Sequence, residues 1–313
     1  MTSALAGLLL AGCASGPDQA GSAAIVNGTA ISLDSIQAQL NNYLANPPSA
    51  SGGQQPSPAD EARSIVSFAV LDKIDNAAVA KYHLNVPAQA VTEYTNELGG
   101  IDKLVQSTGY TAPELQMILR DRVVQMAYAS KYVPGFEVTF DSFVVTDQKS
   151  ATTLTQKLSA DPANARSILT AAAAGAQSQP QFGTKLTGGE IMGEQTQSDQ
   201  QAQQGGGTSG SEEVLPLFEA RSNSVLTFPV AQGQWVVLVV HNADTNGTPS
   251  DSDKTALSQV TSDNLYEAGT FLLSPLAQDL SIKISPRYGV WDTVGMSVVA
   301  SAGQLGVELP NKA

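Results

Sequence analysis

The chain has 313 residues, 42% of them hydrophobic, and a formal net charge of −13. This length suits roughly two domains that are each large enough to bury a core. Binding to nucleic acid depends on clustered Lys and Arg, and this acidic sequence contains no basic run, so we exclude nucleic acid as a partner. Cys13 is the single cysteine, which excludes disulfides within the chain and cysteine-ligated zinc sites.

The first thirteen residues have the pattern of an export signal. Residues 4–11 (ALAGLLLA) form an apolar run that is too short to cross a bilayer and is typical of a signal peptide. The run ends in LAGC at residues 10–13, which resembles the lipobox of bacterial lipoproteins. The resemblance implies cleavage of residues 1–12, a lipid on Cys13, a tether over residues 13–23 and attachment to the outer face of the cell membrane. The alternative is a buried N-terminal strand with an incidental cysteine.

The following part of the chain, residues 24–135, is predicted to be mainly helical. Asn27-Gly28 supplies the positive φ angles of a tight hairpin turn, and Ser32 then caps a first helix. Residues 46–59 are rich in Pro, Ser and Gly, which is typical of a mobile loop. A capping box over residues 111–114 marks the start of a later helix.

Two of these helices carry apolar stripes at helical spacing. The helix that follows the loop runs to about residue 81, and its stripe is Ile65, Phe68, Leu71, Ile74 and Ala78. The helix after the capping box presents Leu115, Ile118, Leu119, Val123 and Met126. Met117 and Met126 would give a bound polypeptide adaptable contacts if they were exposed, although such methionines more often lie in the core.

The pattern changes after residue 135. Residues 136–146 (FEVTFDSFVVT) and 235–241 (WVVLVVH) are predicted strands, and the second is apolar enough to be central in a sheet. Two helical stretches, 148–159 and 163–174, follow the first strand. A Gln/Gly/Ser run over residues 195–211 is predicted to be disordered because it cannot bury a core.

The C-terminal part is predicted to hold a helix from about residue 251, with a bend near Pro275 and a short strand over residues 281–284. The whole pattern predicts an α+β fold: a helical lobe (24–135), a middle α/β module (136–245), and a C-terminal helix, strand and tail (246–313) that pack on the lobe.

This order of elements resembles the SurA/PrsA-type extracytoplasmic foldases, lipoproteins with a helical chaperone lobe and a parvulin prolyl isomerase domain. The motifs that carry the resemblance are SLD at 32–34, YTAPEL at 110–115, GGE at 188–190, LFEA at 217–220 and SPRYGVWD at 285–292. The last motif is similar to the tail of actinobacterial members.

The resemblance further implies a degenerate parvulin pocket. The family places one histidine on the first strand of the domain and one on the last, with a methionine and a phenylalanine around the proline ring. In this chain Ser142 and Val236 stand at the histidine positions, and Val214 stands at the methionine position. The remaining residues of the pocket are Phe218, Phe228 and Trp235. Because twisting a prolyl amide has a barrier of about 18–20 kcal/mol, such losses predict weak catalysis or none.

Other chemistry finds no support in the sequence. It has no Gly-x-Ser-x-Gly elbow, HExxH, P-loop or GxGxxG motif, so no cofactor and no metal site are predicted. The carboxylate pairs Asp72 with Asp75 and Glu212 with Glu213 are interpreted as solvated surface. His83 and His241, the only histidines, are interpreted as surface residues at the ends of their elements.

Three functions remain open at this point. The leading hypothesis is a membrane-anchored chaperone whose partners are unfolded or extended polypeptide clients. The alternatives are an active prolyl isomerase with an unusual pocket, and a binding lipoprotein without chaperone activity.

Overall fold

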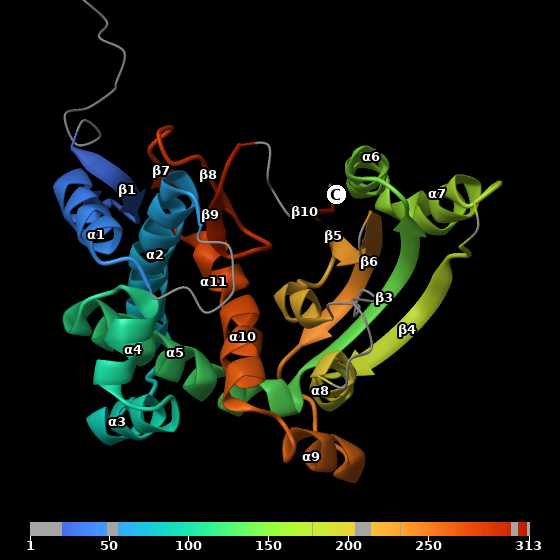
Figure 1. Ribbon diagram of the computed structural model, residues 1–313. Helices are drawn as coiled ribbons and strands as arrows, with labels where there is room; N and C mark the ends of the chain where they lie inside the picture. Colours follow the sequence, from blue (N-terminus) through green and yellow to red (C-terminus); the bar gives the residue numbers. More distant parts are fainter. Residues whose placement is uncertain are drawn as a thin grey trace, which may run out of the picture.

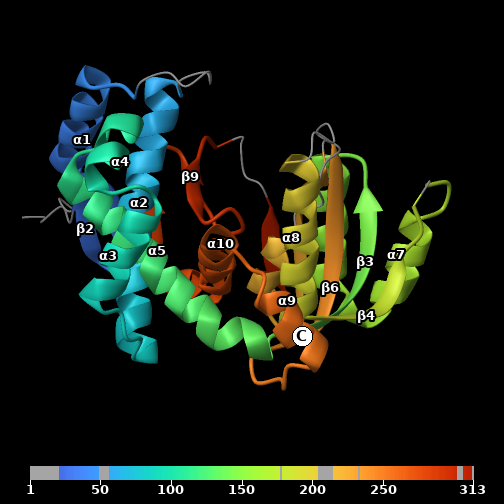
Figure 2. The same ribbon diagram turned by 60° about the horizontal axis from the view of Figure 1, so that its bottom comes forward.

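The computed structural model describes residues 21–48, 56–176, 178–203, 214–231, 233–301 and 306–311. Cys13, the predicted signal peptide and the pair Glu212 and Glu213 lie outside the described residues. The described residues form a mixed α+β fold, which confirms the predicted fold class. A helical lobe and a sheet module stand side by side, with the helix α10 (Ser262–Leu272) between them (Figures 1 and 2).

The helical lobe begins with a hairpin and continues as a series of helices. Its N-terminal elements are β1 (Ser22–Val26), β2 (Thr29–Ser32), α1 (Leu33–Ala45), α2 (Pro58–Tyr82), α3 (Ala88–Glu97), α4 (Ile101–Thr108) and α5 (Ala112–Tyr132). Near the C-terminus, β7 (Ile282–Ile284) pairs antiparallel with β1, which gives a sheet in the order β2-β1-β7. Helix α10 packs against α5, so segments from both ends of the chain form one lobe.

Local sequence signals set the ends of these elements. Asn27 and Gly28 take positive φ angles of 47° and 80° in the predicted hairpin turn. The side chain of Ser32 caps α1 by accepting a backbone hydrogen bond. Thr111 and Glu114 form the predicted capping box of α5. These predictions are confirmed because each cap depends only on residues that are neighbours in sequence.

The sheet module is built around a five-stranded antiparallel sheet. Its elements are β3 (Glu137–Val145), α6 (Gln148–Ala160), α7 (Ala165–Ala172), β4 (Gln181–Thr187), α8 (Gly188–Gln203), the 3-10 helix η4 (Leu215–Glu219), β5 (Ser224–Ala231) and β6 (Gln234–Asp244). The strand order is β10-β5-β6-β3-β4, with β10 (Val307–Pro310) at one edge. The two strands predicted from sequence, β3 and β6, are therefore central neighbours.

Side chains alternate between the two faces of the sheet along each strand, and both faces carry apolar residues. Helices therefore cover both faces. One face packs on α8, and the buried residues there include Val138, Phe140, Leu226, Leu238, Val240, Ile191 and Met192. The other face packs on α6 and α7, and the buried residues there include Phe143, Val225, Val237, Val239, Leu154, Leu158 and Leu169. The module is thus a three-layer structure, with a surface pocket of about 870 Å³ between β3, α6 and the end of α7.

The predicted disordered insertion is partly wrong. Residues 195–203 belong to α8, and the rest of the predicted range, 204–211, lies outside the described residues. Gln, Glu and Ala are good helix formers, so the low apolar content of this stretch does not prevent helix formation. The helix is held in place by the buried Ile191 and Met192 in its first half and by α9 (Asp251–Leu257), which packs beside it.

The C-terminal part differs from its prediction in two ways. The single expected helix is divided, because Thr261 caps a new helix, α10, after α9 has ended. A third helix, α11 (Ser274–Asp279), begins with Pro275 in its first turn, at the position where a bend was expected. The hairpin of β8 (Val290–Asp292) and β9 (Ser297–Val299) then leads to β10, which joins the sheet of the module instead of packing on the lobe.

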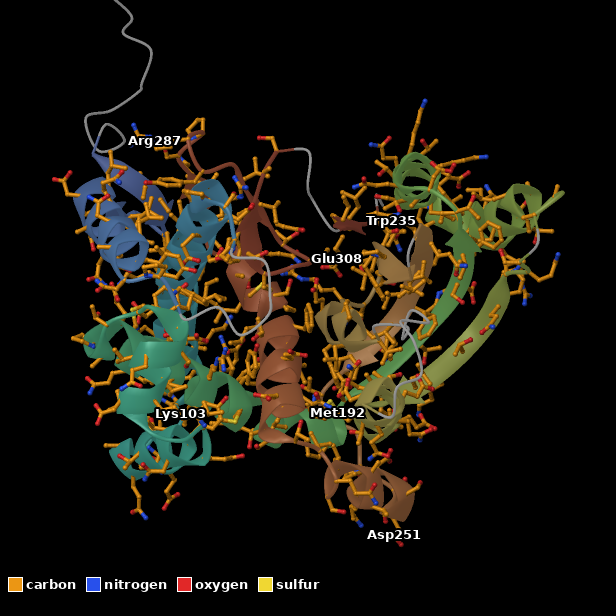
Figure 3. All side chains as sticks on the ribbon, viewed as in Figure 1. Lys103, Met192, Trp235, Asp251, Arg287 and Glu308 are labelled. Carbon is orange, nitrogen blue, oxygen red and sulfur yellow. The ribbon has the colours of Figure 1, made fainter. Side chains whose placement is uncertain are left out.

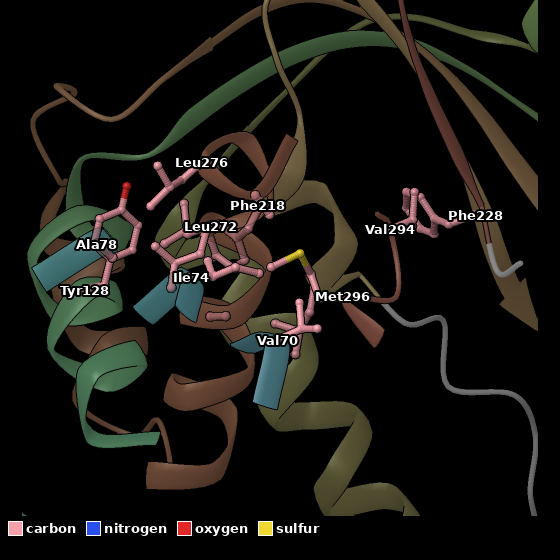
Figure 4. Close-up of a cluster of buried hydrophobic side chains, with 14 of the residues drawn as sticks. Val70, Ile74, Ala78, Tyr128, Phe218, Phe228, Leu272, Leu276, Val294 and Met296 are labelled. Carbon is pink, nitrogen blue, oxygen red and sulfur yellow. The ribbon is translucent and has the colours of Figure 1, made fainter. Parts of the chain in front are cut away.

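The largest buried cluster connects lobe and module (Figure 4). From the lobe it takes Val70, Ile74 and Ala78 on α2, Tyr128 on α5, and Leu272 on α10. Phe218 of η4 reaches the same cluster, as do Met296 and Val294 of the C-terminal segment. Because one core runs through both parts, neither has an interior of its own in this region.

Candidate functional site

The structure brings the two strands of the predicted parvulin pocket together. Ser142 on β3 lies opposite Leu238 on β6, and Val236 lies opposite Val144, so Ser142 and Val236 are two register positions apart. By strand alternation both point to the face that packs on α8. Trp235, at the start of β6 (Figure 3), packs on the opposite face with the cluster of α6 and α7.

The other predicted pocket residues lie in the core. Phe218 and Phe228 are 1% and 2% exposed, and Val236 is 8% exposed. The Phe218 ring meets Phe136 edge to face, with centroids 4.9 Å apart. Val214 is partly buried against the same cluster. These side chains hold the module together, and a proline ring would need their space.

Both histidines are exposed as predicted, but only His83 lies at the end of its element, because β6 continues past His241 to Asp244. His83 ends α2 in a left-handed conformation with φ of 51°. The His241 side chain is 47% exposed, and its Nε2 lies 3.2 Å from Oδ1 of Asp141. Neither residue lines the groove described next.

An open groove runs along α2 on the surface of the lobe. One pocket of about 280 Å³ lies between α2, α5, α10 and the segment at Gly295. A second pocket of about 440 Å³ lies between α2 and residues 296–300. The two share Phe68, Leu71 and Met296, so they form one continuous depression. We call it the lobe groove.

The walls of the lobe groove are largely apolar. Phe68 and Leu71 come from α2, Ile118 from α5 and Phe271 from α10, and all four are half-buried. Met296 of the C-terminal segment borders the groove, but its side chain is only 2% exposed and belongs to the buried core.

The floor of the lobe groove is polar. Asp121 and Gln125 of α5 line it, and they are 5% and 3% exposed. Arg120 donates to Asp121 Oδ1 at 3.0 Å. Burial, and next the charge of Asp72, raises the pKa of Asp121 to about 7, although Arg120 acts in the opposite direction.

A second buried carboxyl lies behind this floor. Asp75 of α2 is 0% exposed and accepts one hydrogen bond, from Gln125 Nε2 at 3.1 Å. Its other oxygen, Oδ1, has no hydrogen-bond partner among the described residues. Burial, and next the charge of Asp121, raises the pKa of Asp75 well above its usual range. The interpretation of Asp72 and Asp75 as solvated surface was therefore wrong for Asp75.

The rim of the lobe groove carries charges of both signs. The guanidinium of Arg122 stacks over the Tyr266 ring at 4.6 Å from its centroid. Glu267 of α10 lies on the same rim. In the described part of the chain, no group of three or more His, Cys, Asp or Glu could hold a metal ion. The arrangement offers non-covalent contacts to an apolar chain with a few polar anchors.

Some residues of the lobe groove were predicted from the sequence as apolar, but the groove itself was not predicted. Phe68, Leu71 and Ile118 belong to the predicted apolar stripes, whose spacing does not tell which members line a groove. Asp75 stands four residues after Leu71 and one after Ile74, so its helical position did signal burial. Met296 had no signal in the sequence. The expected methionines, Met117 and Met126, do not line the groove, and Met126 packs between α3, α4 and α5.

Comparisons with known proteins found a structural likeness and no match in sequence. No protein-family model and no curated protein sequence matches the chain. Among solved structures, the chain is similar to the foldase protein PrsA from Lactococcus lactis, with 11% sequence identity and a TM-score of 0.27. The match covers 84% of this chain and 94% of that chain. A likeness this distant carries no argument about function.

Proposed function

We propose that this protein is a chaperone or foldase that holds extended segments of unfolded secreted or envelope proteins. The observation that carries the proposal is the lobe groove, an open depression on the surface of the lobe whose walls include the half-buried side chains of Phe68, Leu71 and Phe271. An elongated apolar groove fits an extended polypeptide better than a compact solute.

Binding in this groove would be weak and tolerant of sequence. Full burial of one Leu or Phe side chain contributes about 1.5–3 kcal/mol, and ordering the bound segment offsets part of this gain. The walls contribute shape and apolar area and few directional hydrogen bonds, so many client segments would bind. Reversible capture of this kind shields a client from aggregation without ATP.

We further propose that the sheet module acts as a scaffold, because the predicted pocket residues fill its core. The attachment of the protein to the outer face of a membrane through lipid on Cys13 also remains a proposal, based on the lipobox-like LAGC at residues 10–13. None of the described helices is long and apolar enough to span a membrane.

An aggregation assay tests the proposed function. We expect the wild-type protein to slow the aggregation of a chemically unfolded client at equimolar ratio. The double variant Phe68→Ser with Phe271→Ser should lose most of this effect, because it removes two apolar walls of the groove. Far-UV circular dichroism and thermal unfolding check that the variant remains folded.

Leu44→Ser is the matched control. Leu44 on α1 is a large hydrophobic residue, 47% exposed, that does not line the lobe groove. Its replacement removes exposed apolar surface and should leave the protection of the client unchanged. A wild-type protein that protects no client, or a folded double variant as protective as wild type, would overturn the proposal.

A further inference from the structure

The floor of the lobe groove contains a carboxyl group that a bound polypeptide would cover. Asp121 lines the groove and is 5% exposed, so a client side chain seated there would remove its remaining contact with water. Covering an ionised carboxylate costs far more free energy than covering a neutral carboxyl group. The protonation of Asp121 therefore changes what the groove can bind.

The surroundings of Asp121 do not fix its charge. Arg120 is its single ion-pair partner among the described residues and also lies 3.9 Å from Asp72, so its charge is shared. Behind Asp121, Asp75 is fully buried with an oxygen that has no partner in the described part of the chain. Two carboxylates in one helix interface with one shared guanidinium favour retention of a proton.

The other charged and titratable groups around this site come from three helices. They are Asp60, Arg63, Asp72 and Lys73 on α2, Arg120 and Arg122 on α5, and Tyr266 and Glu267 on α10. Lys73 pairs with Asp72 at 2.9 Å, and Arg122 stacks on Tyr266. Residues 295–300, which close the groove, contribute no titratable side chain. Asp121 is thus the titratable group at the floor itself.

We propose that Asp121 makes the lobe groove sensitive to pH, so that it binds uncharged apolar polypeptide segments more strongly in mildly acidic surroundings than in mildly alkaline ones. This inference rests on the proposed function and adds its regulation. A raised pKa near 7 for Asp121 would place the change in the physiological range.

The test is a binding titration of the whole protein at different pH values. The probe is a short capped peptide of Gly, Ser, Leu and Phe with a neutral fluorophore, so that the peptide itself does not titrate. We expect its affinity to fall between about pH 6 and about pH 8, by at most roughly tenfold per pH unit, the limit for release of one proton. Asp121→Asn keeps the shape of the side chain and should bind with an affinity that does not change with pH.

Asp75→Asn is the matched control for a buried carboxyl outside the groove. Asp75 does not line the groove, so a bound peptide would not cover it and the variant should keep the pH dependence of the wild type. Binding that is present but independent of pH in the wild type would overturn the inference. So would an Asp121→Asn variant with an unchanged pH profile.

A second measurement separates this inference from the proposed function. If the wild type binds no peptide at any pH, the proposed function fails. A carbon-13 NMR titration of the Asp121 carboxyl then measures the pH at which this group loses its proton. A midpoint near 7 would retain Asp121 as a titrating group at the groove, and a midpoint near 4 would overturn its role.

Discussion

The helical lobe and the sheet module differ in how completely they bury the apolar side chains at their candidate sites. In the module, helices cover both faces of the sheet, and Phe218 and Phe228 at the predicted pocket are at most 2% exposed. In the lobe, α2, α5 and α10 leave Phe68 and Leu71 half-buried along an open groove. The residues of the predicted pocket in the module are therefore closely packed, whereas the residues that line the lobe groove stay partly exposed. The module does have a surface pocket of about 870 Å³ elsewhere, between β3, α6 and the end of α7.

The physical cause lies in how helices and strands pack. The strands of a sheet present continuous faces that a layer of helices can cover completely. Helices meet along ridges and grooves, so three crossing helices leave a depression where their ridges diverge. The lobe combines a close contact of α5 with α10 and a more open region over α2.

The largest effect should come from breaking that close contact with Gly269→Ala. A Cβ atom at residue 269 would lie 2.0 Å from the backbone oxygen of Gln125, so α10 must move away from α5. We expect the free energy of unfolding to fall by about 1–3 kcal/mol, measured by denaturant unfolding. Client protection should fall as well, because α10 forms one wall of the groove.

The matched control for this substitution is Gly193→Ala in α8 of the module. There the nearest atom to an added Cβ is 3.5 Å away, so no neighbour has to move. Alanine favours the helix, and we expect a gain of about 0.5–1 kcal/mol. Equal decreases in the free energy of unfolding for Gly269→Ala and Gly193→Ala would contradict a tight contact between α5 and α10.

A smaller effect is expected on the pH dependence of the free energy of unfolding, to which Asp121 of the lobe contributes. Asp121 keeps its proton in the folded chain up to about pH 7, whereas an unfolded Asp releases it near pH 3.9. The unfolded state binds fewer protons between these values, so stability is highest below the unfolded pKa and falls as pH rises toward the folded pKa. The slope should be at most about 1.4 kcal/mol per pH unit for each group.

Denaturant unfolding between about pH 5 and pH 7 measures this slope, and Asp121→Asn should make it shallower. Hydrogen bonds from Ser150 lower the pKa of Asp147. The contribution of Asp147 to the stability of the folded state is therefore lost only at lower pH, as the pH falls toward this lowered pKa. Asp147→Asn should therefore leave the slope unchanged. A flat wild-type profile in this range would contradict a raised pKa at the lobe interface.

The smallest expected effect is in the module, where we expect prolyl isomerisation of a short peptide at the uncatalysed rate. The combined variant Ser142→His and Val236→His should gain nothing, because the Val236 side chain packs in the core and leaves no pocket for a proline ring. A rate several-fold above the uncatalysed one in either protein would show that the module opens to substrate.

Prediction from sequence succeeded for features that depend on near neighbours. The hairpin turn at Asn27 and Gly28 and the capping box at Thr111 and Glu114 are examples. The central strands β3 and β6 were also predicted, because long runs of branched residues identify buried strands. The strands β4 and β10 were missed, because their residues pair with strands that are distant in the sequence. The strand β5 was also missed, although it pairs with β6, the next strand along the chain.

The sequence by itself determined the α+β class, the helical character of the first part of the chain and most of the apolar stripes. The tertiary structure decided which stripe residues stay open to solvent, that Asp75 is buried, and that residues 307–310 join the sheet of the module. The physical reason is that caps and periodicity act over one or two turns of chain. A groove and a buried carboxyl instead depend on how α2, α5, α10 and the C-terminal segment meet in space.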